Sequence, residues 1–197
     1  TKNSKTMKNS NQHTNKGNYT KFILMLVASF IAMYITMYLN SYALDHVYFS
    51  LTRFYMSCLG IAAMAVIMWF FMRKMYNDRK KNIAILAGSF ILFIGALGLV
   101  RAQSPIIGDV LWMKAMIPHH SIAILTSERA NIEDVRVREL ANGITKAQRK
   151  EIKQMEWLIQ DIEDNGKALN ASQAENRAVP SFEGHLTKSS GKDDSSR

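Results

Sequence analysis

The sequence is poor in cysteine and in acidic residues. Its single cysteine, Cys58, excludes a disulfide within the chain, and a buried, inert thiol is its expected role because it lies in an apolar run. Only 16 acidic residues stand against 25 Lys and Arg, and residues 1–21 contain none. No nucleophile elbow, phosphate loop, dinucleotide fingerprint or nucleic-acid-binding motif is present. We therefore expect neither an enzyme nor a nucleic-acid partner.

Three long apolar runs occupy residues 22–39, 54–72 and 83–100. Each lacks charged residues and approaches the roughly 20 residues that a helix needs to cross the hydrocarbon core. A helix satisfies its own amides in lipid, whereas a lone strand does not. The sequence therefore predicts a three-helix transmembrane region over 22–101, embedded in the lipid bilayer.

The loop charges predict the orientation. Between the second and third runs, one acid faces five bases: Arg73, Lys74, Arg79, Lys80 and Lys81. The positive-inside rule places this loop and a disordered basic arm, 1–21, in the cytoplasm. The C-terminal part then lies outside a bacterial cytoplasmic (inner) membrane, in the periplasm or the exterior. Residues 40–53, with Asp45 and His46, form the first outer loop and are expected to be solvated.

After the membrane region, the pattern predicts a two-helix extracytoplasmic domain over 102–165 and a disordered tail over 166–197. The helices are expected at 109–130 and 133–164. At 100° per residue, the second has one narrow stripe: Val137, Leu140, Ile144, Gln148, Glu151, Met155, Leu158 and Ile162. A carboxylate in this stripe, Glu151, must be paired, ligated or protonated unless its packing position reaches solvent.

Two thioethers and two imidazoles are concentrated in the first of these helices. Met113, Met116 and His120 share a face, and His119 lies about 100° round from His120. Pro118 is expected to bend the helix or tighten a turn. Thioethers suit Cu(I), and imidazole suits copper, zinc, iron and nickel. Because methionine at helical spacing is usually core filler, spacing alone leaves both metal binding and ordinary packing open.

Two strings carry a family resemblance. Met113-Lys-Ala-Met116-Ile-Pro-His119-His120-Ser-Ile-Ala-Ile, followed by Ala147-Gln148-Arg-Lys-Glu151-Ile152-Lys-Gln-Met155, resembles the signature of the domain-of-unknown-function 305 family. The resemblance covers roughly 105–164, and the apolar spans are similar to its membrane-anchored bacterial subgroup. It implies a ferritin-like repeat of two helices and, for some members, periplasmic copper binding. The site it implies comprises Met116, His119, His120, Glu151 and Met155, with Met113 as an optional addition. Ser121 departs from the Gln that many relatives have.

The expected fold is all-α: three transmembrane helices followed by an extracytoplasmic antiparallel helix pair, a ferritin-like half-bundle. Two helices bury little surface alone, so a homodimer is expected to complete a four-helix bundle. Packing of the pair against the membrane helices is the alternative. The Glu-x-x-His pairs of di-iron bundles are absent, so oxygen chemistry is not expected.

The expected function is a membrane-anchored, extracytoplasmic metal-binding protein. Copper is the expected ion, with zinc also compatible, for capture, buffering or hand-off to a periplasmic metal-handling protein. One alternative is a Met-rich three-helix metal transporter, suggested by the spacing of Met64 and Met68. Another is a metal-free structural dimerisation module.

Overall fold

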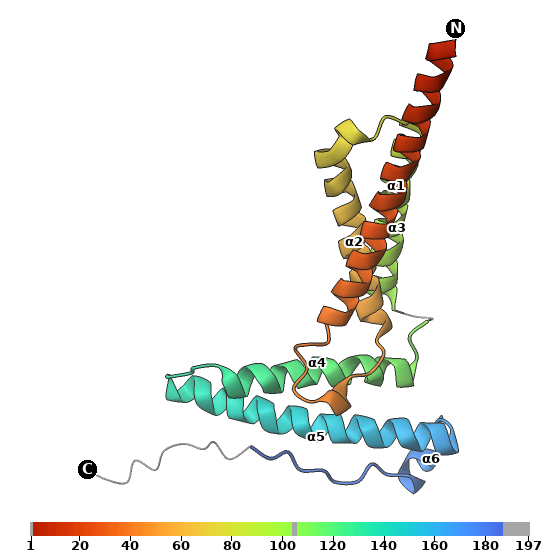
Figure 1. Ribbon diagram of the computed structural model, residues 1–197. Coiled ribbons are helices and arrows are strands. Elements are labelled where there is room, and N and C mark those ends of the chain that lie inside the picture. Colours follow the sequence, from red (N-terminus) through yellow and green to blue (C-terminus); the bar gives the residue numbers. More distant parts are fainter. Residues whose placement is uncertain (1, 104–105, 187–197) are drawn as a thin grey trace, which may run out of the picture. The chain divides into compact units, whose positions relative to one another are not determined.

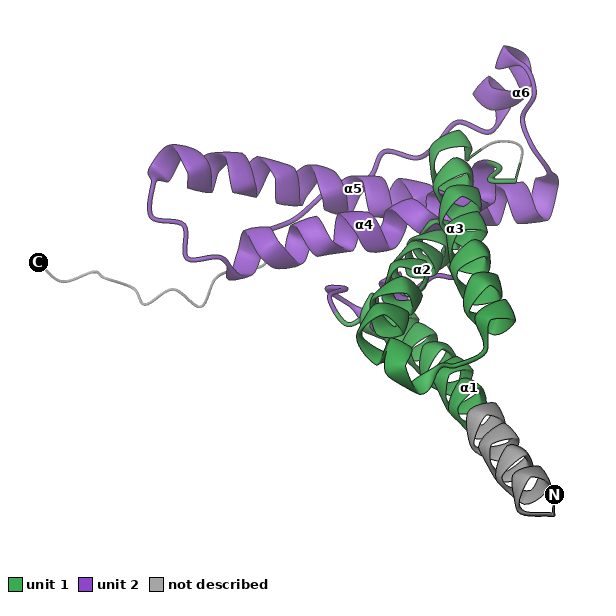
Figure 2. Cartoon of the chain, turned by 90° about the horizontal axis from the view of Figure 1, so that it is seen from above, with its two compact units in different colours: residues 1–39, 50–108 green, residues 40–49, 109–197 purple. Residues whose placement is uncertain are grey.

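The computed structural model describes residues 2–103 and 106–186, with side chains from Asn18 onward. Within these ranges all regular secondary structure is helical, which confirms the predicted all-α class. The chain divides into two compact units (Figure 2). Unit 1 contains residues 1–39 and 50–108, and unit 2 contains residues 40–49 and 109–197.

Unit 1 contains α1 (Lys2–Thr36), α2 (Leu51–Met72), the short 3₁₀ helix η2 (Arg73–Met75) and α3 (Arg79–Ala102) (Figure 1). Helix α2 packs against both α1 and α3. Three segments are long and apolar enough to cross a membrane: Asn18–Thr36, Leu51–Met75 and Arg79–Ala102. The predicted spans are thus confirmed in number and composition, with boundaries shifted by a few residues.

The end of the predicted disordered arm is ordered. Tyr19 belongs to α1, and its side chain is 7% exposed. Its hydroxyl accepts the Asp78 N–H at 3.1 Å and donates to Asn82 Oδ1 at 2.8 Å. Its ring also packs on Tyr76, with centroids 5.0 Å apart. Polar composition suggested disorder, but these partners, about 60 positions away, fix the segment; side chains 1–17 lie outside the described residues.

Unit 2 is built on α4 (Asp109–Arg129) and α5 (Val135–Asn165), close to the predicted bounds. The Asp134 carboxylate caps α5 by accepting the Arg136 and Val137 N–H groups, and Gly166 ends the helix with a positive φ of 73°. Near the start of α4, Lys114 Nζ lies 2.8 Å from Glu163 Oε1, near the end of α5.

The buried side of α5 is turned from the predicted stripe. Ala141 and Thr145 are buried, whereas Leu140 is 64% exposed. Met155 is buried as its place in the stripe required. Small residues occupy the buried side in the first half of α5, because they let a neighbouring helix approach closely. The larger apolar residues are therefore left facing outward there.

The start of the predicted disordered tail is also ordered. Helix α6 (Ala171–Asn176) follows α5, and residues 177–186, which we call the C-terminal strap, run back along α5 (Figure 1). Arg177 Nη1 lies 3.0 Å from Asp161 Oδ2, and Lys153 Nζ donates to Glu183 O at 3.3 Å. The tail has few large apolar residues to bury, which suggested disorder. These ionic and backbone contacts hold it in place instead. Residues 187–197 lie outside the described part.

Candidate functional site

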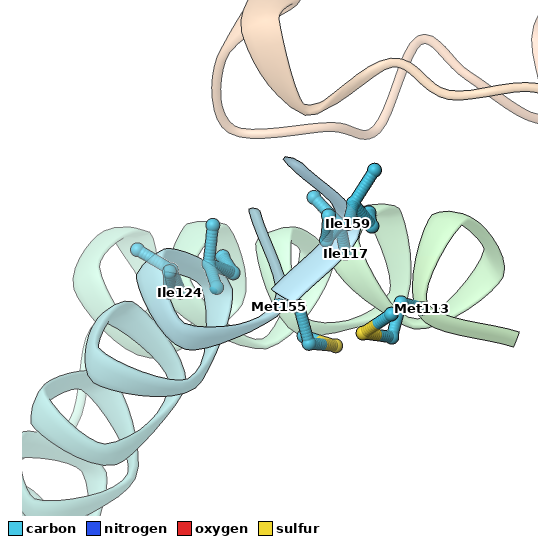
Figure 3. Packing of buried hydrophobic residues seen from close by; sticks show 6 residues of the cluster. Met113, Ile117, Ile124, Met155 and Ile159 are labelled. Carbon is cyan, nitrogen blue, oxygen red and sulfur yellow. The ribbon is translucent and has the colours of Figure 1, made fainter. Parts of the chain in front are cut away.

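The candidate site begins in the core of unit 2. Six buried apolar residues of α4 and α5 form it: Met113, Ile117, Ile124, Ile152, Met155 and Ile159. Figure 3 shows the thioethers of Met113 and Met155 pointing toward each other from the two helices. Met116 packs against this cluster from the side. Helix α4 continues through Pro118, so the residues on either side keep their helical spacing.

A histidine of α4 and a carboxylate of α5 meet across the helix pair. His120 Nδ1 of α4 lies 3.4 Å from Glu151 Oε2 of α5. Glu151 comes one helical turn before Met155, and His120 one turn after Met116, so each shares a face with a thioether. The His120 side chain is 18% exposed and that of Glu151 is 47% exposed. The structure therefore brings His120 to Glu151 and, within the core, Met113 to Met155.

Two polar atoms at this place are buried without a hydrogen bond to any described residue. They are His120 Nδ1 and Gln148 Oε1. The His120–Glu151 contact is within ion-pair distance but lacks hydrogen-bond geometry. Gln148 lies three residues before Glu151 and so faces the same way on α5. A buried acceptor without a partner is costly, which makes these two atoms candidates for binding a ligand.

The protonation state of His120 is the one that metal ligation requires. Burial lowers the pKa of its imidazole below 6.5, although the Glu151 charge acts in the opposite direction and His119 adds to the lowering. The neutral ring is therefore the dominant form near pH 7, and only a neutral ring has a lone pair to offer a metal.

His119 is separated from the other candidate ligands. Its side chain is exposed, and its ring centroid lies 6.3 Å from that of His120 with the planes inclined at 53°. No group of three or more His, Cys, Asp or Glu able to hold a metal occurs among the described residues. A mononuclear site within one chain would therefore need thioethers beside His120 and Glu151.

Ser121 has a structural role that the sequence did not reveal. It is fully buried, and its Oγ accepts the Tyr42 N–H at 2.7 Å and lies 2.9 Å from His46 Nδ1. The expectation of a solvated loop is thus wrong for Tyr42 and His46, whereas Leu44 and Asp45 of the short helix η1 (Leu44–His46) are exposed as expected. The available signal was a small hydroxyl between Ile117 and Ile124 on the buried face.

Arg149 fastens several segments to α5. Its guanidinium lies 2.8 Å from Glu128 Oε1 of α4 and donates to the Tyr42 hydroxyl at 3.1 Å and to the His185 carbonyl of the strap. Arg149 and Glu151 are two residues apart, so they point roughly 160° away from each other around α5. The 40–49 loop and the strap therefore cover one side of unit 2, and the His120–Glu151 pair lies on the other.

These features define a class: an all-helical chain with three potential membrane helices and a compact helical unit containing a Met/His/Glu cluster. Residues 109–192 match the domain of unknown function 305 (DUF305). The chain is also 31% identical over 148 residues to "Uncharacterized protein L153" of Acanthamoeba polyphaga mimivirus, covering 73% of this chain and 94% of that protein. No solved structure matches. The chain belongs to the DUF305 family.

Proposed function

We propose that this chain is a membrane-anchored metal-binding protein, not an enzyme, that captures, buffers or hands on copper. The observation that carries the proposal is the buried His120 Nδ1, which lies 3.4 Å from Glu151 Oε2 without a hydrogen bond, on the same helix pair that holds the facing thioethers of Met113 and Met155. Met113, Met155 and Met116 would supply sulfur. His119, exposed beside His120, would receive the ion as it enters or leaves.

The donor set favours copper over other metals. Thioether sulfur is soft and prefers Cu(I), whereas imidazole and carboxylate also accept Cu(II) and Zn(II). Zinc is therefore the second candidate. The site combines buried sulfur with a half-exposed carboxylate, an arrangement that supports exchange of the ion.

The setting of the site follows from the charge pattern and the helix contacts. The basic segment 73–81 supports a cytoplasmic N-terminus, and with it a position of unit 2 outside a bacterial inner membrane. Contacts such as Lys114–Glu163 and Arg138–Ser127 support an antiparallel pair, half of a ferritin-like bundle. A homodimer would complete the bundle, and a periplasmic metal-handling protein would exchange the ion.

The two alternatives have less support. The transport alternative needs methionines that are free to bind an ion. The Met33 sulfur instead packs against Gly60, since a Cβ added to Gly60 would lie only 2.8 Å from it, which supports helix packing as the role of that thioether. A metal-free dimerisation module would have to satisfy its buried polar atoms within the chain or through the second copy. His120 Nδ1 and Gln148 Oε1 are not satisfied by any described residue.

The test uses the full chain, purified in detergent without a His tag or added metal. Cu(I) with a competing chelator and, separately, Zn(II) are titrated into the wild type and His120→Ala. His185→Ala, which removes an exposed imidazole of the strap, is the matched control. We expect one tight copper site, lost in His120→Ala and kept in the control. A wild-type chain with an intact helical spectrum that binds neither ion would refute the proposal.

A further inference from the structure

We propose that a second copy of this chain docks on an exposed face of α5 in an antiparallel, two-fold arrangement. Six exposed residues define this face, which we call the α5 open face: Arg136, Leu140, Gly143, Ile144, Ala147 and Glu151. At 100° per residue they fall within a sector about 100° wide. Leu140 is 64% exposed and Ile144 is 37% exposed, so large apolar side chains face solvent in the single chain.

The order of residues along the α5 open face is self-complementary. Gly143 and Ile144 lie at its centre; Leu140 and Ala147 are equidistant from that centre, and so are Arg136 and Glu151. An isologous two-fold contact pairs each residue with its counterpart in the other copy. Leu140 would therefore meet Ala147, and Ile144 would meet Gly143, so that large residues pack on small ones.

The charges follow the same symmetry. In this register, Arg136 of one copy faces Glu151 of the other at both ends of the contact. Arg136 now pairs with Asp134 at 2.6 Å, but its side chain is 90% exposed. An exposed ion pair contributes little to stability. Exchanging the Arg136–Asp134 pair for one with Glu151 of the second copy therefore costs little free energy. A parallel arrangement would instead oppose like charges, which selects the antiparallel one.

Gly143 gives independent support. It lies well inside α5, where glycine costs about 1 kcal/mol relative to alanine. A Cβ at this position would meet nothing within 4 Å, so no contact within the described chain requires its absence. The side chain of Ile144 from a second copy would occupy this space.

The pattern favours a second copy over other occupants. The 40–49 loop and the C-terminal strap are held at Arg149, on the far side of α5. A membrane surface would favour a basic face, whereas this face contains one cation and one anion. The inference rests on the proposed function in one respect. Glu151 belongs both to the α5 open face and to the proposed metal site, so Arg136 of the second copy would lie beside that site.

The first test is crosslinking of the full chain in lipid vesicles. In a Cys58→Ser background, Ile144→Cys places one thiol near the two-fold axis, and a short bis-maleimide reagent reports proximity. Glu139→Cys is the matched control, because Glu139 is also exposed on α5 but lies about 100° away from Leu140. We expect a linked dimer with Ile144→Cys and loss of the link with Glu139→Cys. Equal linking at both positions, or none at Ile144→Cys, would overturn the proposal.

The second test is a charge exchange, read as the dimer fraction in detergent by light scattering. Arg136→Glu or Glu151→Arg alone should lower the fraction, and the two together should restore it. Failure of the double variant to recover would contradict the antiparallel register. Copper titration separates the two proposals. If Arg136→Glu binds copper but does not dimerise, the proposed function stands without the dimer. If the wild type dimerises but binds no metal, the dimer inference stands without the proposed function.

Discussion

Ser121 and His46 are joined by a 2.9 Å contact between Oγ and Nδ1, although 75 positions separate them. The same Oγ accepts the Tyr42 N–H at 2.7 Å, so the one hydroxyl hydrogen is available to the imidazole. One buried serine thus holds the 40–49 loop on α4. The nature of this contact leads to the first two predictions.

Ser121→Ala should release the loop. The change leaves the Tyr42 N–H without its acceptor, at a cost of about 1–3 kcal/mol. We expect faster hydrogen exchange at Tyr42 and a lower midpoint of thermal unfolding. Thr126→Ala is the control, because that exposed hydroxyl bonds only to carbonyls of its own helix. Similar exchange at Tyr42 in wild type and Ser121→Ala would show that the serine does not hold the loop.

The stability of unit 2 should fall on acidification through His46. Burial lowers the pKa of this imidazole below 6.5; the Arg149 charge adds to the effect and the Asp45 charge opposes it. The folded chain therefore binds fewer protons than the unfolded chain. The contribution of neutral His46 to the free energy of unfolding is complete above pH 6.5, and it is lost as the pH falls through 6.5 toward the folded pKa.

The measurement compares thermal midpoints of wild type and His46→Gln between about pH 7.5 and pH 5.5. The wild-type midpoint should fall further, since Gln offers a neutral acceptor at both pH values. His120 is present in both proteins and cancels in the difference. Parallel midpoints would exclude His46 as the group that titrates.

Arg149→Met should destabilise unit 2 by about 2 kcal/mol, because Glu128 loses its partner in a mostly buried pair. The strap should also become a protease-sensitive segment. Lys150→Met, at the next, exposed position, should change the free energy of unfolding very little. Chemical denaturation and limited proteolysis measure the two effects, and equal losses for both variants would argue against the special role of Arg149.

Replacing Met113 and Met155 together by Leu should separate packing from ligation. Leu nearly conserves the buried volume, so stability should change by less than about 1.5 kcal/mol per site. Loss of two thioethers should weaken Cu(I) binding at least tenfold and leave Zn(II) binding almost unchanged. Competition titrations measure both affinities. Unchanged Cu(I) affinity would assign these residues to the core alone.

Local sequence features predicted the helices well. Uncharged apolar runs and the apolar stripe of α5 depend on neighbouring residues, so they set the element bounds within a few positions. Met155, His120 and Glu151 were also expected near one another. In contrast, the roles of Tyr19, Ser121 and Arg149 depend on partners far away in the chain, and hydropathy contains no record of such partners. The rotation of the buried side of α5 was missed because Ala141 and Thr145 give a weak apolar signal.

The placement of the 40–49 loop in unit 2 has a consequence for biogenesis. The loop emerges from the ribosome with α1 and α2, but its anchors, Ser121 and Arg149, are synthesised about 80 to 110 residues later. The α1–α2 hairpin therefore forms with an unfinished loop, which closes only after α4 and α5 have been translated. Contacts of such long sequence separation form slowly. Completion of unit 2 would thus act as a late checkpoint on assembly of the whole chain.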